Sequence, residues 1–163
     1  MGNFDALKEW EIPISDSFGK YELGKSSDDF NDIKDLKPIF SFDYISLDKN
    51  EFGFMGTLLG SKDYKNLLKS LKDISKHTYG QLSKEHCFHF HEIDWNDVSV
   101  QSSAFYKCIY GEFYNGTETD ITPYQFKSYQ EARVIGFLYK GVFYLVMFDR
   151  GHNAYKRKDK KKR

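Results

Sequence analysis

The chain has 163 residues, and its 24 Lys and Arg balance 24 Asp and Glu, so the formal net charge is zero. This length suits one domain with a core of its own, which needs neither metal nor disulfide bonds to hold it. The longest apolar run, Val142 to Phe148, is far shorter than the roughly 20 residues that cross a bilayer, and no charged-then-apolar leader opens the chain. We therefore expect a cytoplasmic protein without a membrane partner.

Aromatic residues make up 18% of the chain, with 15 Phe and 12 Tyr. These residues suit strands and the helix faces that pack on them, so the composition favours an α+β fold. Within a single domain we distinguish an N-terminal arm (1–37), an α+β core (38–153) and a basic tail (154–163). Cys87 and Cys108 are expected to be reduced, because an isolated structural disulfide is uncommon in the cytosol.

The start of the core predicts a β-hairpin. Residues 39–47 alternate aromatic with small or polar side chains, which is the period of a strand. A polar turn over 48–51 follows, and the apolar residues 52–59 return as a second strand. In the arm before this hairpin we predict only a short helix over 26–36.

Residues 62–77 predict the main helix, with Ser61 as its N-cap. Charged residues occupy one face, and apolar side chains recur at spacings of three and four on the other: Tyr64, Leu67, Leu68, Leu71 and Ile74. This helix should cover one face of a sheet.

Residues 86–93 alternate with the period of a strand, which places Cys87, His89 and His91 on one face and Phe88 and Phe90 on the other. We expect this histidine-rich strand to lie at the centre of the sheet. A short helix over 102–110, a polar loop over 112–122 and a helical turn over 123–131 are predicted to follow.

The end of the core gives the strongest hairpin signal. Residues 132–139 and 142–148 are rich in β-branched and aromatic residues, and Lys140-Gly141 between them suits a two-residue turn. The second of these strands has almost no polar interruption, so both its faces should be covered. Together these elements predict a largely antiparallel sheet of about five strands, two hairpins and the histidine-rich strand, with one main helix packed on it.

Two histidines give the first candidate site. His89 and His91 point the same way in a strand, and with Cys87, Asp94 or His86 they have the donor atoms that zinc or iron prefers. No third ligand stands at a recognised metal-binding spacing, so no cofactor is expected, and a histidine-ligated metal protein is one of three hypotheses for the function. The same imidazoles also suit general acid–base chemistry, or a solvated sheet face.

The second candidate site lies at one end of the last hairpin. Across a two-residue turn, Arg133 should fall opposite Met147 to Asp149, which brings it near His152. Metal-free RNA cleavage requires a base, an acid and positive charge at the phosphate. The candidate catalytic residues are Arg133, His152, Tyr155 and His91. A purely structural interpretation is that Asp149 pairs with Arg133 or Arg150.

The tail is strongly basic. Residues 154–163 contain seven Lys or Arg and one Asp, and such a cluster suits the phosphate backbone of a nucleic acid, with RNA favoured. The candidate nucleic-acid contacts are Arg150, Lys156, Arg157 and Lys158. The competing interpretation is a solvated tail without a partner.

The order of predicted elements from Ser61 to Arg157 resembles the RelE/ParE superfamily of small bacterial toxins. The resemblance implies a helix-backed antiparallel sheet that carries basic residues and a late tyrosine or histidine on its open face. Arg133, His152, Tyr155 and Arg157 occupy comparable places. It favours a metal-independent endoribonuclease of toxin type. The second hypothesis is a non-enzymatic accessory protein of a mobile element or defence system, which binds a protein or nucleic-acid partner, and the third is the metal protein described above.

Overall fold

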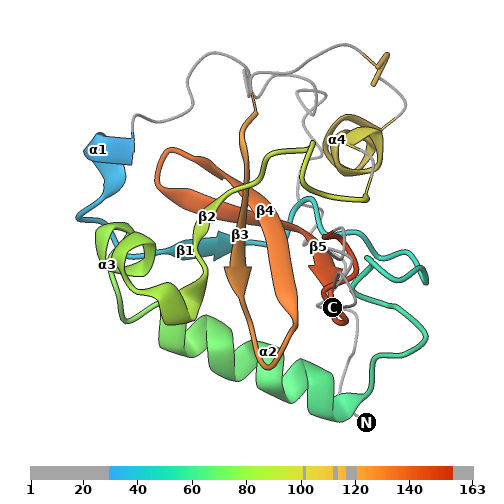
Figure 1. The fold of residues 1–163 in the computed structure, drawn as a ribbon, viewed down its shortest axis with the longest axis horizontal. Helices are drawn as coiled ribbons and strands as arrows, with labels where there is room; N and C mark the ends of the chain where they lie inside the picture. Colours follow the sequence, from blue (N-terminus) through green and yellow to red (C-terminus); the bar gives the residue numbers. More distant parts are fainter. Residues whose placement is uncertain (1–29, 101, 112–113, 117–120, 156–163) are drawn as a thin grey trace, which may run out of the picture.

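The computed structural model describes residues 30–100, 102–111, 114–116 and 121–155. Most of the predicted arm and nearly all of the basic tail lie outside these ranges. Within them the chain forms a five-stranded sheet with helices around it (Figure 1), which confirms the α+β prediction. The strand order is β1-β5-β4-β3-β2, with β1 parallel to β5 and the other neighbours antiparallel.

The strands are β1 (Ile39–Ser41), β2 (His91–Glu92), β3 (Pro123–Lys127), β4 (Arg133–Tyr139) and β5 (Val142–Asp149). The helices are α1 (Phe30–Ile33), α2 (Ser61–Ile74), α3 (Tyr79–Lys84) and α4 (Ser102–Tyr110), and a 3-10 turn spans His86–Phe88. The α2 and α4 helices match the two helices predicted in the core.

The hairpin of β4 and β5 lies inside the sheet, as predicted. Its turn residues Lys140 and Gly141 have φ angles of 49° and 75°. A two-residue turn with positive φ at both positions has a backbone twist that matches the right-handed twist of the flanking strands. A β-bulge interrupts the pairing between Ile135 and Gly136, where a Cβ on Gly136 would collide with the carbonyl of Tyr144. Only glycine allows this close approach of the two strands.

Both faces of the sheet are covered by apolar side chains. On one face Leu67, Leu71 and Ile74 of α2 join a cluster with Phe126 and Phe148. On the other, a second cluster gathers around α4: Phe105, Tyr106, Ile135, Phe137, Val146 and Met147. Figure 1 shows α2 and α4 on opposite sides of the sheet. Two covered faces explain why β5 has so few polar residues.

The predicted first hairpin is wrong. Only β1 is a strand, and it pairs with β5 instead of with residues 52–59. The rest of the segment turns repeatedly and binds β5 through single backbone hydrogen bonds, from Ser46 N to Val146 O (2.8 Å) and from Phe148 N to Phe52 O (2.9 Å). This segment therefore forms its hydrogen bonds with the edge of β5 instead of with itself.

The predicted histidine-rich strand is also largely wrong. Residues 86–88 form a 3-10 turn, His89 takes a left-handed φ of 46°, and β2 is a two-residue strand at the edge of the sheet. Phe90 is buried in the cluster on the α2 face, and the Phe88 ring packs on His77 at 4.7 Å. Packing of these two aromatic rings replaces strand pairing.

Residues 123–131 were predicted as a helical turn, but 123–127 form β3 beside β4. Tyr124 and Phe126 alternate with Gln125 and Lys127, which is the period of a strand. The β3–β4 turn then closes through a hydrogen bond from Ala132 N to Tyr129 O of 2.8 Å. No helix within the described ranges is long and apolar enough to cross a membrane.

Candidate functional site

Polar side chains gather at one end of the sheet on the face that also carries α4. Lys127 of β3 pairs with Arg133 of β4, and Arg133 pairs in turn with Asp149 of β5. The second pairing agrees with the prediction from the two-residue turn. His91 pairs with Gln125 on the neighbouring strands. Residues that are paired, or two apart, share a face of a sheet. All five side chains therefore start from the face opposite α2.

Arg133 is a buried cation. The residue is only 4% exposed, and its Nη1 donates to the carbonyls of Glu131 (2.9 Å) and Ala132 (3.2 Å). Loss of solvent lowers the pKa of the guanidinium, and the negative charge of Glu131 opposes that shift. Because the group is covered, its positive charge acts on this face mainly through the electrostatic field.

Asp149 organises the turn that follows β5. It is 1% exposed, and its two carboxylate oxygens accept the backbone N–H groups of Asn153 (2.9 Å) and Ala154 (2.8 Å). His152 lies within this turn with a φ of 55°, a conformation unusual for a residue other than glycine. The sequence suggested that Asp149 pairs with Arg133 or Arg150. Its two carboxylate oxygens instead accept backbone N–H groups, and Arg150 pairs with Asp63. The carboxylate thus holds the turn that carries His152 and leads to Tyr155.

His152 and Tyr155 are in contact, with ring centroids 5.0 Å apart. Burial, and then the charge of Arg133, lower the pKa of His152 below its ordinary 6.5. Burial raises the pKa of Tyr155 to about 12, although Arg133 opposes that rise. At neutral pH a neutral imidazole therefore lies against a protonated phenol, which is the charge state of a base beside an acid.

The two other histidines lie close to this pair. Partial loss of solvent lowers the pKa of His89, followed by the positive charges of Arg133, Lys127, His91 and His152. Each of these four groups is near enough to act on His89. Nδ1 of His91 lies 2.7 Å from the Glu92 carbonyl and its Nε2 lies 2.8 Å from Nε2 of Gln125.

Arg150 is not part of this group. It follows Asp149 directly and points to the α2 side, where its Nε lies 2.9 Å from Oδ1 of Asp63. Tyr129 donates to the same oxygen at 2.6 Å, and the other oxygen of Asp63 accepts the Gly60 N–H at 2.8 Å. Gly60, and not Ser61 as predicted, is the N-cap of α2.

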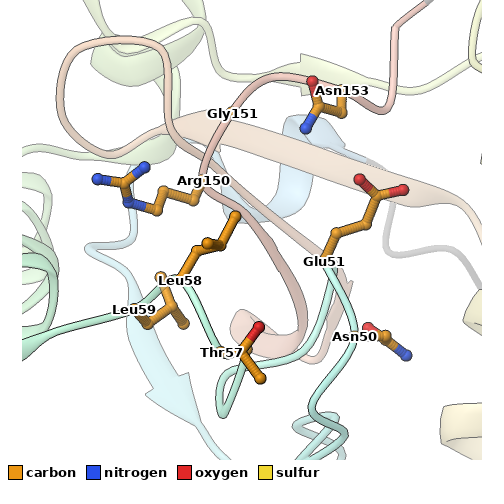
Figure 2. A pocket seen from close by; sticks show the side chains of 9 residues that line it. Asn50, Glu51, Thr57, Leu58, Leu59, Arg150, Gly151 and Asn153 are labelled. Atoms are coloured by element: carbon orange, nitrogen blue, oxygen red, sulfur yellow. The ribbon is translucent and has the colours of Figure 1, made fainter.

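Arg150 also lines a pocket of about 260 Å³ between the 50–59 loop and the turn after β5. In Figure 2, Arg150 and Glu51 lie on opposite sides of this pocket, with Leu58 between them. The Leu58 side chain is exposed. Gly151 and Asn153, the two neighbours of His152, also line the pocket, so it adjoins the turn that carries His152.

Asp63 makes the stability of the fold depend on pH. Hydrogen bonds from Tyr129, Gly60 and Arg150 lower its pKa from 3.8 to about 2. A carboxyl whose pKa is lowered by folding stabilises the folded protein at every pH above the pKa that the carboxyl has in the unfolded chain. Here that contribution is lost as the pH falls from about 4 towards 2. We expect Asp63→Asn to cost about 2 kcal/mol at pH 7. In denaturation curves this difference should vanish near pH 2, and a difference that persists there would contradict the assignment.

The structure brings together Arg133, His152, Tyr155, His89 and His91, and it separates Arg150 from them. Lys156, Arg157 and Lys158 lie outside the described residues. No three His, Cys, Asp or Glu side chains of the described ranges come together in a way that could hold a metal ion. Sequence reasoning missed Gln125 and Lys127 because it placed them in a helical turn, although their alternation with two aromatic residues was a strand signal.

The fold and this face define a small α+β protein with imidazole, phenol and guanidinium groups at one end of its sheet. Residues 55–163 match the protein family described as "Uncharacterised protein UU032", and the chain belongs to that family. No curated protein and no solved structure matches the chain.

Proposed function

We propose that this protein acts on RNA and cleaves its backbone without a metal ion, as RNA-cleaving members of the toxin superfamily that it resembles do. The observation that carries the proposal is the contact between a neutral His152 and a protonated Tyr155 beside the buried charge of Arg133. We also propose that it acts in the cytoplasm, where Cys87 and Cys108 stay reduced.

In the proposed reaction, His152 takes the proton of a ribose 2′-hydroxyl as the oxygen attacks the adjacent phosphorus. The bond from phosphorus to the 5′-oxygen breaks, and Tyr155 gives its proton to that oxygen. The products are a 2′,3′-cyclic phosphate and a free 5′-hydroxyl. Proton exchange with water then restores the imidazole and the phenol. Such acid–base assistance typically contributes 10²–10⁴-fold in rate.

Positive charge has two sources in this proposal. Lys127 is partly exposed and stands next to Arg133 across the β3–β4 pair, so it is suited to contact the phosphate. Arg133 is buried and stabilises the developing negative charge through its field. Lys156, Arg157 and Lys158 follow Tyr155 in the sequence and supply further positive charge for the RNA backbone, which makes binding sensitive to salt.

A non-enzymatic binding protein is the second candidate, because one observation favours it. The α4 cluster is rimmed by half-buried aromatic residues with polar tips: Tyr44, Trp95, Tyr110, Tyr114, Tyr139, Tyr144 and Tyr155. Among the described residues, the cluster on the α2 face has only Tyr124 and Tyr129 of this kind at its rim. Tyr and Trp are enriched at binding interfaces and stack on unpaired bases.

A labelled single-stranded RNA incubated with the full chain in excess EDTA tests the proposal. We expect cleavage products that end in a 2′,3′-cyclic phosphate, and binding that weakens as salt rises or when residues 158–163 are deleted. Binding without cleavage would favour the accessory protein. If RNA is neither bound nor cleaved, both candidates fail.

A further inference from the structure

Two buried side-chain atoms of the described residues have no hydrogen-bond partner: Oε1 of Gln125 and Nε of Arg133. Both residues belong to the candidate site, and they are 2% and 4% exposed. Buried polar atoms are nearly always paired, because an unpaired one has lost its hydrogen bonds to water. Their coincidence at this face points to a group that binds there.

The register places the two side chains diagonally across one strand pair. Gln125 pairs with Ile135, and Arg133 lies two residues before Ile135 on the same face of β4. Diagonal neighbours are within reach of each other when both side chains are long. One small group is therefore able to contact both.

The hydrogen bonds of His91 fix what Gln125 offers. The Glu92 carbonyl only accepts, so Nδ1 of His91 carries the proton that it shares at 2.7 Å. In the tautomer that carries its proton on Nδ1, Nε2 is bare and accepts from the Gln125 amide at 2.8 Å. The nitrogen of Gln125 is thereby used, and its free oxygen is an acceptor.

The pair accordingly presents one acceptor, Oε1 of Gln125, and one donor, Nε of Arg133. A single hydroxyl satisfies both, since it accepts one hydrogen bond and donates another. In nucleic acids the ribose 2′-hydroxyl has this property, and DNA lacks it. The His91 ring that contacts Gln125 is exposed, so the pair lies beside a residue at the surface.

Resting on the proposed function, we infer that Gln125 and Arg133 bind the 2′-hydroxyl of a nucleotide next to the scissile bond and so distinguish RNA from DNA. This gives Gln125 a role in specificity. It also makes His91 a positioning residue, because both of its ring nitrogens are engaged by the protein.

The test measures the affinity of a His152→Ala background, in which cleavage should be roughly 10²–10⁴-fold slower, for oligonucleotides of one sequence at one salt concentration. The probes carry 2′-hydroxyl, 2′-fluoro or 2′-hydrogen. We expect RNA to bind about tenfold more tightly than DNA, the equivalent of one or two net hydrogen bonds. The 2′-fluoro probe should bind like DNA, because fluorine cannot donate to Gln125.

Gln125→Leu should lower the affinity for RNA towards that for DNA, because one of the two contacts to the 2′-hydroxyl is lost, and leave the affinity for DNA unchanged. Lys127→Leu, on the same face, should instead weaken both equally, because a phosphate contact does not read the sugar. Melting curves check that each variant is folded, and Gln125→Met, which keeps the side-chain length, replaces the leucine variant if that one does not fold.

An unchanged RNA-to-DNA ratio in a folded Gln125 variant overturns the inference and indicates that the two atoms are satisfied by ordered water only. Cleavage of RNA without any preference over DNA in binding also overturns it and leaves the proposed function standing. If neither nucleic acid binds, the proposed function fails and this inference fails with it.

Discussion

His152→Ala should lower the rate of RNA cleavage by roughly 10²–10⁴-fold, the usual contribution of a general base. The side chain is about one-third exposed and lies in a turn held by the Asp149 carboxylate, so its removal should leave the fold intact. The measurement is the single-turnover rate on a labelled RNA. His77→Ala is the matched control: that ring packs on Phe88, away from the proposed machinery, and its loss should not change the rate.

The pH profile separates a chemical role of His152 from a structural one. Because burial and Arg133 lower its pKa below 6.5, the rate should rise with pH only on the acidic side of 6.5 and stay level above it. Tyr155, with a pKa of about 12, keeps its proton over that range. Tyr155→Phe should reduce the rate and keep the acidic limb. A His152→Ala enzyme that retains both the rate and that limb would remove His152 from the chemistry.

The parts of the fold that the sequence predicts well are those in which local and long-range preferences agree. Helix α2 has its apolar residues at helical spacing, and Leu67, Leu71 and Ile74 are buried as expected, whereas Leu68 is exposed. The β4–β5 hairpin has a turn whose φ angles Lys140-Gly141 accept. Each of these elements is specified by residues near one another in the chain.

The failures come where a partner distant in the sequence decides the pairing. β1 has three residues, and its partner β5 lies about a hundred positions later, so the hairpin to residues 52–59 was the nearer but wrong choice. β3 was missed because Pro123 at its start suggested a turn, although a proline is tolerated as the first residue of a strand. Gln125 and Lys127 were missed with it.

For the site, two simple rules had different outcomes. Counting back from a two-residue turn correctly placed Arg133 opposite Asp149. Grouping Arg150 with them ignored the alternation of side chains in a strand, which sends Arg150 to the α2 face and to Asp63. The burial of Arg133 depends on what covers it, and no local pattern in the sequence discloses that.

Asp149→Asn should lower the free energy of unfolding by about 2–4 kcal/mol, although the two side chains have the same shape. The carboxylate accepts two backbone N–H groups, from Asn153 and Ala154. An amide has one oxygen, so its NH₂ group would face a backbone donor. The substitution also removes a negative charge that favours the charged form of the buried Arg133.

Chemical denaturation at neutral pH measures the loss. Asp73→Asn is the control, because Asp73 is exposed on α2 and its ion pair with Lys76 should be worth less than about 1 kcal/mol. Since Asp149 also holds the turn that carries His152, RNA cleavage should fall in the variant even at temperatures where it is folded. Equal stabilities of the two variants would mean that the turn is held by other contacts, and that Asp149 does not connect the stability of the sheet to the geometry of the site.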